Sequence, residues 1–169
     1  MTTLRLTLFS LLFCGLLYTA GIFAFAQISQ PEKANGSLVY NPAGQVIGSR
    51  LIAQNFTSDR YFHPRPSACD FNAQAACGSN FAPSNPALTE RAQKIIAATG
   101  ASEATPIPAD LVTSSGSGLD PHITRAAALF QIERIAKARR LDSANLQLLI
   151  PDSPLVNVLD INLALDHSH

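Results

Sequence analysis

The residue types of a serine-hydrolase triad gather in one short stretch, at Ser117, Asp120 and His122. In such triads a histidine takes the proton of a serine hydroxyl, and a carboxylate orients the histidine. The nucleophile motif G-x-S-x-G is not met, because Gly116, Ser117 and Gly118 follow one another without spacers. Three residues this close in sequence can rarely aim at one substrate atom. A small anchored or secreted hydrolase using Ser117 and His122 is therefore the alternative interpretation.

The run Ser114–Gly118 also invites interpretation as a phosphate loop, since backbone N–H groups at the start of a helix bind anions. It lacks the pattern G-x-x-x-x-G-K-[ST]. Asp120-Pro121 predicts a helix start, with Asp as N-cap and Pro at the first helical position. A negative Asp120 would therefore face the anion, so we interpret the run as a structural turn whose glycines permit unusual backbone angles.

Metal ligands are not suitably spaced in this chain. His63, His122, Cys69 and Cys77 form no C-x-x-C or H-x-x-x-H pair, so no metal site is predicted. Cys69 and Cys77 are eight positions apart and either form a disulfide, if the domain is exported, or remain separate thiols. A bridge across so short a loop would stabilise the fold by about 2–3 kcal/mol on the loop-entropy model.

The balance of charge argues against nucleic acid as a partner. The chain has 12 basic and 12 acidic residues, a net charge of zero, and therefore no basic field to hold phosphates. One basic cluster falls at the end of a predicted helix, where cations meet the negative end of the helix dipole. It consists of Arg134, Lys137, Arg139 and Arg140.

Few and short elements are predicted in the first half of the folded part. Strand-like runs at Ser37–Tyr40 and Gln45–Ala53 flank a plausible turn, Asn41–Gly44. Residues 54–86 form a long loop broken by four prolines, and loops of this length usually bind partners or carry function. A second loop covers residues 106–119.

Helices are predicted at 87–99 behind an Asn85 cap, from Pro121 to about Arg140, and through Leu149 behind an Asp142 cap. In the tail, the apolar residues Ile161, Leu163 and Leu165 alternate with other residues, which predicts a half-buried strand. The mixture of helices and non-adjacent strands indicates an α+β fold.

The segment Leu6–Ala26 contains no charge, and its 21 residues would form a helix long enough to cross a membrane. The alternative is a cleaved secretory signal, for which Ala24-Phe25-Ala26 is a suitable site. Arg5 predicts that the N-terminal flank stays cytoplasmic. We therefore expect residues 1–5 to be cytoplasmic, 6–26 to be a membrane helix, 27–36 to be a polar tether, and 37–169 to be an extracytoplasmic domain.

Four segments, taken in order along the chain, resemble the C subunit of the Kdp-type potassium-transporting P-type ATPase. They are Tyr61-Phe62 with Arg65–Ala68, Gly78–Asn80 with Pro83–Leu88, Asp110–Ile123, and Pro154–Leu159 with Asn162–Leu165. Each motif is weak by itself, but four in family order are specific.

The resemblance implies a non-catalytic accessory subunit of a high-affinity, ATP-driven potassium import complex, single-pass in the cell (inner) membrane. Its implied partners are a channel-like potassium-translocating subunit, an ATP-hydrolysing P-type subunit, a small single-helix subunit and the lipid membrane. The resemblance also implies roles in assembly and stability, and as a catalytic chaperone that raises the ATP affinity of the pump. ATP and potassium would be handled by the complex, with no cofactor bound directly by this chain.

Residues of the two loops are expected to serve the structure and partner docking, with no catalytic residue among them. Segments interrupted by Pro and Gly become ordered only through hydrogen bonds, and binding is often placed on such loops. The expected residues are Arg65, Ser67, Ser79, Asn80, Asn85, Ser114, Gly116, Ser117, Gly118, Asp120 and His122.

Overall fold

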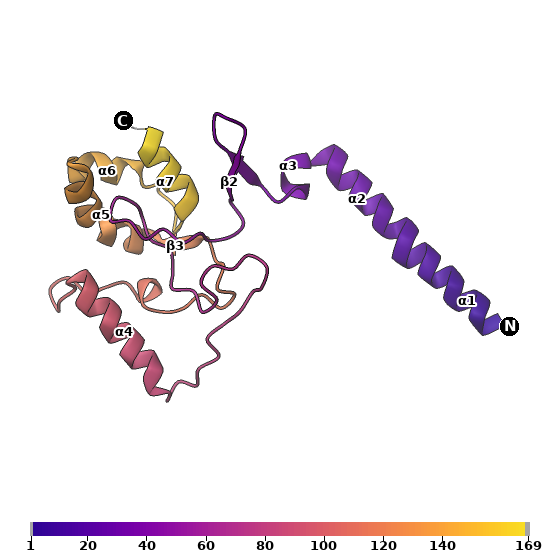
Figure 1. Ribbon diagram of the computed structural model, residues 1–169, viewed down its shortest axis with the longest axis horizontal. Coiled ribbons are helices and arrows are strands. Elements are labelled where there is room, and N and C mark those ends of the chain that lie inside the picture. Colours follow the sequence, from indigo (N-terminus) through magenta and orange to yellow (C-terminus); the bar gives the residue numbers. More distant parts are fainter. Residues whose placement is uncertain (1, 168–169) are drawn as a thin grey trace. The chain divides into compact units, whose positions relative to one another are not determined.

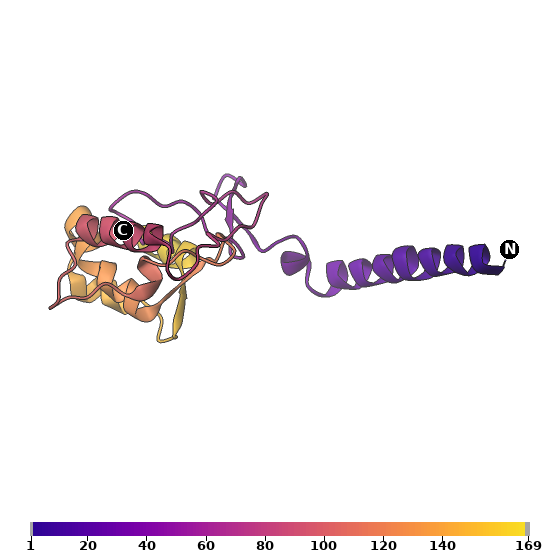
Figure 2. The same cartoon turned by 90° about the horizontal axis from the view of Figure 1, so that it is seen from below.

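A long apolar helix opens the part of the chain that the computed structural model describes, residues 2–167. It consists of α1 (Thr2–Ser10), a π-helical stretch (Leu11–Leu17) and α2 (Tyr18–Ser29), drawn as one continuous rod in Figures 1 and 2. These 28 residues are long and apolar enough to cross a membrane. The predicted membrane segment 6–26 lies within this helix.

The chain divides into two compact units between Ile47 and Gly48. In the first unit, the expected tether is largely helical, because α2 extends to Ser29 and is followed by α3 (Pro31–Ala34). Pro31 suits the first position of α3, since its missing N–H would have no partner there.

The predicted hairpin is confirmed, with β1 (Leu38–Tyr40) paired to β2 (Val46–Ser49). Its turn closes when Asn41 Oδ1 accepts the N–H of Gln45 at 2.9 Å, and Gly44 supplies a φ of 76°. The second strand ends at Ser49, so the predicted extension to Ala53 is wrong.

Helices and one small sheet make up the second unit. Its elements in order are α4 (Pro86–Thr99), a 3-10 turn (Ala109–Leu111), β3 (His122–Thr124), α5 (Arg125–Arg139), α6 (Ser143–Leu149), β4 (Leu155–Asn157) and α7 (Val158–His167). The strands β3 and β4 are antiparallel, with Ile123 opposite Val156. The described part of the chain is thus a mixed helix and strand structure.

Two of the predicted helices begin where expected. Asn85 accepts the N–H of Ala87 at 2.9 Å as the N-cap of α4, and Gly100 follows the last helical residue with a φ of 68°. Asp142 accepts the N–H of Ala144 at 3.1 Å as the N-cap of α6. In both cases a short polar side chain satisfies a free N–H of the first helical turn.

The predicted helix start at Asp120-Pro121 is wrong, because α5 begins at Arg125. Its N-cap is Thr124, whose hydroxyl accepts the N–H of Ala127 at 3.1 Å. Residues 122–124 pair with β4 instead, and the carbonyl of Pro121 accepts the N–H of Val158 at 2.9 Å. Pairing with a strand distant in sequence therefore outweighs the local capping signal.

The predicted tail strand is also wrong, since this segment forms the helix α7. The helix buries Val158, Ile161, Asn162 and Leu165, at spacings of three and four residues. Asn162 is only 2% exposed although it is polar. Because Asn162 is polar but buried, the helical spacing of buried residues in this segment resembled the alternation of apolar and polar residues in a strand.

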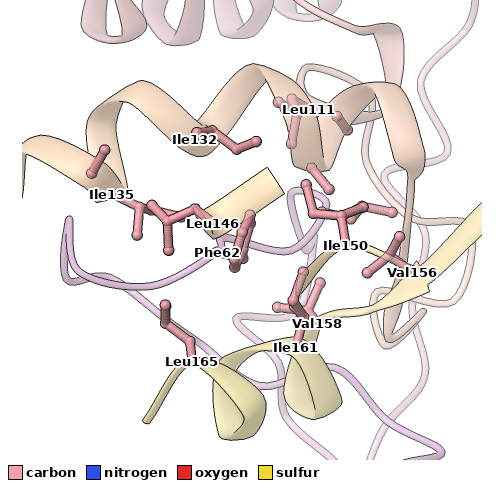
Figure 3. Packing of buried hydrophobic residues seen from close by; sticks show 14 residues of the cluster. Phe62, Leu111, Ile132, Ile135, Leu146, Ile150, Val156, Val158, Ile161 and Leu165 are labelled. Carbon is pink, nitrogen blue, oxygen red and sulfur yellow. The ribbon is translucent and has the colours of Figure 1, made fainter. Parts of the chain in front are cut away.

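The hydrophobic core belongs entirely to the second unit and surrounds Phe62, a residue of the long loop that is fully buried. Figure 3 shows Phe62 among Leu146, Ile150, Ile135 and Val158, which come from the helices and the segments that follow them. Burying a phenylalanine side chain contributes about 1.5–3 kcal/mol to stability. The core therefore fixes the loop on which several of the expected docking residues lie.

Candidate functional site

Two buried side-chain amides hold the loop around Phe62 to the helices. Asn162 Oδ1 accepts the N–H of Phe62 at 2.8 Å, and Asn162 Nδ2 donates to the Phe62 carbonyl at 3.0 Å. Gln131 on α5 does the same for His63, at 2.8 and 3.1 Å. A carboxamide offers both a donor and an acceptor, so each one replaces the strand partner that this loop lacks.

Two arginines of the basic cluster reinforce this anchoring. Arg134 donates to the carbonyls of Asp59 and Tyr61, at 2.7 and 2.9 Å. Arg139 donates to the carbonyl of Arg60 at 2.8 Å and pairs with Asp166 at 2.6 Å. We interpret the basic cluster at the end of α5 as meeting the negative end of the helix dipole. Two of its four residues, Arg134 and Arg139, also hold the loop in position.

Arg65 links this anchored loop to the segment Ser114–His122, which we call the polar turn. Its guanidinium lies 3.4 Å from Asp120 Oδ2, from Thr113 Oγ1 and from the Ser114 carbonyl. The Nε of Arg65 and the hydroxyl of Ser114 are buried without a hydrogen-bond partner among the described residues. Buried polar atoms without partners are costly, so the polar contact between Arg65 and this turn is incompletely satisfied.

Asp120 organises the polar turn from within. Its Oδ1 accepts the backbone N–H of His122 at 3.0 Å and lies 3.5 Å from His122 Nδ1, while its Oδ2 faces Arg65. Its own N–H donates to the Ser115 hydroxyl at 3.2 Å. Asp120 is therefore the centre of a turn network, in place of the helix cap that the sequence predicted.

The small residues of the polar turn pack closely against residues 66–78. Ser115, which is 2% exposed, donates its N–H to the Pro66 carbonyl at 2.9 Å. The Ser117 carbonyl accepts the N–H of Cys77 at 2.8 Å. Gly118 has a φ of 70°, and a Cβ there would collide with the Cys69 sulfur and lie 2.8 Å from the Cys77 carbonyl. A close backbone approach and a left-handed angle both require glycine at this position.

Gly116 is the opposite case, because a Cβ added there would meet no atom within 4 Å. The backbone of Gly116 also lies outside the left-handed region. The polar turn is therefore braced on one side by residues 66–78 and open to solvent at Gly116.

The structure links most of the expected docking residues to one network, with Asn85 as an exception. Ser67 Oγ accepts the N–H groups of Cys69 and Phe71, at 3.2 and 3.0 Å. Ser79 and Asn80 follow Gly78, where a Cβ would lie 2.9 Å from the Gly116 carbonyl. Asn85 belongs to the cap of α4.

The triad-type residues do not form a catalytic arrangement. Ser117 Oγ lies 3.2 Å from Ser115 Oγ and accepts the N–H of Leu119 at 3.1 Å. His122 contacts Asp120, and within residues 2–167 no hydrogen bond joins it to Ser117. The hydrolase alternative therefore has no support from the geometry.

Both loop cysteines are free thiols, and their side chains hydrogen-bond to each other. The disulfide between Cys69 and Cys77 thus stays a prediction. Among the described residues, no group of three or more His, Cys, Asp or Glu side chains is arranged to hold a metal ion.

Several anchoring residues were missed by sequence reasoning, namely Asp110, Gln131 and Asn162. Asp110 accepts both the N–H and the hydroxyl of Thr124, at 2.7 and 3.1 Å, and so supports the start of α5. A signal existed for Gln131, because it interrupts the apolar face of α5 and a buried polar side chain needs a partner. Nothing local marked Asp110.

The chain matches known proteins over nearly its whole length. The model of the family "K+-transporting ATPase, c chain" (KdpC) matches residues 1–167. The potassium-transporting ATPase KdpC subunit of Parvibaculum lavamentivorans is 44% identical, covering 97% of this chain and 94% of the relative. The subunit of Gloeobacter violaceus is 46% identical, covering 98% and 94%, and that of Bacillus cereus is 44% identical, covering 96% and 92%.

Proposed function

The chain belongs to the KdpC family, the c chains of K⁺-transporting ATPases, and from this premise we propose that it docks onto its partner subunits through the polar turn. It is a membrane-associated accessory subunit of a potassium import complex and is not itself catalytic. The observation that carries the docking proposal is the polar turn itself, braced from behind by residues 66–78 and open at Gly116.

The proposed docking surface offers the chemistry that a protein interface needs. Backbone groups of the polar turn are already fixed by internal hydrogen bonds, so little conformational entropy remains to be lost on binding. The buried Arg65 Nε and Ser114 hydroxyl lack partners among the described residues. Because both atoms are buried, the groups of the polar turn that a partner could reach directly are those at the exposed residues Gly116 and Ser117.

The second unit is placed outside the cytoplasm in this proposal, with the helix Thr2–Ser29 kept as an inner-membrane anchor. Support comes from Arg5, which favours a cytoplasmic N-terminal flank, and from the length of the apolar helix. A mature protein that begins near Gln27 when isolated from membranes would contradict the anchor.

The partners proposed are a channel-like potassium-translocating subunit, an ATP-hydrolysing P-type subunit and a small single-helix subunit. We place the second unit over the outer mouth of the potassium pathway. Because cytoplasmic ATP would lie across the membrane from this unit, any increase in the ATP affinity of the pump would be transmitted through the partner subunits.

Substitution at Gly116 tests the docking proposal without disturbing the fold, since a side chain there would enter open space. We expect Gly116→Arg to lower the fraction of this chain that copurifies with the other subunits in mild detergent by about tenfold. Ala144→Arg, on an exposed position of α6, is the matched control and should assemble normally.

Potassium-stimulated ATPase activity, measured per assembled complex, separates assembly from turnover. Complexes that do form with Gly116→Arg should turn over at the normal rate. If the Gly116→Arg chain copurified normally with the other subunits, the docking proposal would be refuted. Normal assembly with abolished turnover in Asp120→Ala or His122→Ala would place these residues in the transport cycle.

A further inference from the structure

Cys69 and Cys77 meet at one carbonyl of the polar turn. The Ser117 carbonyl accepts the N–H of Cys77 at 2.8 Å and lies 4.0 Å from the Cys69 sulfur. The missing side chain of Gly118 leaves the space that both cysteines fill. Cys69 and Cys77 lie at the two ends of a loop, and both contact the Ser117 carbonyl of the polar turn.

The loop between the cysteines is tied back by the Ser67 hydroxyl, which accepts the N–H of Phe71 at 3.0 Å, and its inner residues make local hydrogen bonds such as Ala75 N–H to the Asn72 carbonyl at 3.1 Å. Its residues 72–76 are exposed, and Asp70 and Phe71 adopt left-handed φ angles of 50° and 58°. Such angles are unfavourable for residues with a side chain and persist only where the surroundings impose them. The structure holds these angles with both thiols free, and a covalent tie at the two ends of the loop would further restrict its opening.

We propose that Cys69 and Cys77 are a dithiol pair that is oxidised to a disulfide, which fastens residues 69–77 onto the polar turn. The oxidant is a protein disulfide of a dithiol–disulfide oxidoreductase, the class that serves an oxidising compartment. This inference rests on the proposed function in two respects: the second unit must lie outside the cytoplasm, and the polar turn is the surface that the disulfide would fix before assembly.

The pKa values of the two thiols are shifted in opposite directions. This difference suits the two steps of disulfide exchange, in which one cysteine attacks the oxidant and the other then resolves the mixed disulfide. The pKa of the Cys69 thiol is lowered, mainly by the hydrogen bond from Cys77 and then by Ser67. The same hydrogen bond, in which Cys77 keeps its proton, raises the pKa of Cys77 to about 11. Cys69 is therefore the thiolate that attacks first, since thiolates are the nucleophiles in disulfide exchange.

The exchange balances in two steps. The Cys69 thiolate attacks one sulfur of the oxidant, which forms a mixed disulfide and releases one thiolate of the oxidant. Cys77 then gives up its proton and attacks the Cys69 sulfur, which releases the second thiolate. Two electrons and two protons pass to the oxidant, which leaves as a dithiol.

Alkylation and mass spectrometry test the chemistry on the full chain purified in detergent. Trypsin should release residues 61–91 as one peptide containing both cysteines, because Arg65 precedes a proline. After oxidation by a glutathione disulfide buffer, we expect this peptide to lose two hydrogens and to take no alkyl group, whereas the reduced peptide takes two. Cys77→Ser should take one alkyl group or one glutathione. Two separate glutathione adducts in the unaltered chain would overturn the pair.

Proteolysis tests whether the disulfide acts as a fastening. We expect oxidation to slow chymotrypsin cleavage after Phe71 by about tenfold relative to the reduced chain, because the disulfide should suppress opening of this loop. Cys69→Ser with Cys77→Ser, under the same oxidant, is the control and should show no change. Oxidation that leaves the cleavage rate unchanged would overturn the fastening.

The state of the pair in cells separates this inference from the proposed function. Cells quenched in acid and alkylated should yield the oxidised peptide. A pair that oxidises in the test tube but stays reduced in cells would refute the extracytoplasmic placement, with the pair itself intact. A pair that cannot be oxidised in either setting would refute the inference alone.

Discussion

Gly116 and Gly118 lie two positions apart in the polar turn, yet they should respond to substitution in opposite ways. Gly118→Ala adds a Cβ at a φ of 70° and against the Cys77 carbonyl, so we expect it to lower the free energy of unfolding by about 1–3 kcal/mol. Gly116→Ala meets no atom and should change it by less than about 0.5 kcal/mol.

Urea unfolding of the full chain in mild detergent measures both effects. Equal losses from the two alanine substitutions would mean that the tight packing at Gly118 contributes nothing to stability.

His63 makes the second unit sensitive to acid. Burial of its side chain lowers its pKa below the usual 6.5, and the charge of Arg134 lowers it further. Because the folded state disfavours the protonated ring, stability is complete above pH 6.5 and is lost as the pH falls toward the lowered pKa. The free energy of unfolding should therefore decrease between pH 7 and pH 5. His63→Gln should flatten that decrease, and an unchanged slope would contradict the assignment to His63.

Helix α7 stabilises the fold through its buried apolar side chains and also through a hydrogen-bonding polar side chain, Asn162. Asn162→Leu should lower the free energy of unfolding by about 2–3 kcal/mol, because the buried N–H and carbonyl of Phe62 would lose their partner. Asn145→Leu, at an exposed position of α6, should be nearly neutral. Thermal or urea unfolding of the two variants gives the comparison, and similar losses from both would refute the anchoring role.

The elements that sequence predicted correctly carry their own local signals. Asn85 with Pro86 marks the start of α4, and Asp142 marks the start of α6, since each cap acts on the helix that directly follows it. The Asn41–Gly44 turn is equally local. For these elements the sequence was sufficient because the deciding hydrogen bonds lie within a few residues.

The elements that sequence predicted wrongly depend on distant partners. Asn162 occupies a buried position of α7 only because the Phe62 backbone pairs with it, and this polar residue hid the helical spacing. Asp120 would have been a helix cap had residues 122–124 not paired with β4. Within the candidate site, the residue types were foreseen, but the link from Arg65 to Asp120 joins residues 55 positions apart.

For the whole molecule, the location of the core predicts that the second unit folds alone. Every buried apolar residue of the main cluster lies beyond Gly48. A fragment of residues 48–169 should therefore be folded without detergent, with a melting temperature within about 3 °C of the full chain. Far-UV circular dichroism during heating measures this. An unfolded fragment would show that the first unit is required for folding of the core.

The contact between Asn162 and Phe62 spans 100 residues, and this separation sets an order of events during synthesis. The chain near Phe62 is made early, but the amide that holds it is made 100 residues later. Contacts so distant in sequence form late in folding, because closing the intervening chain costs entropy. The residues that lead into the polar turn thus gain their fixed positions only after translation has reached α7. Assembly through this surface would admit chains that extend through α7 and leave shorter ones behind.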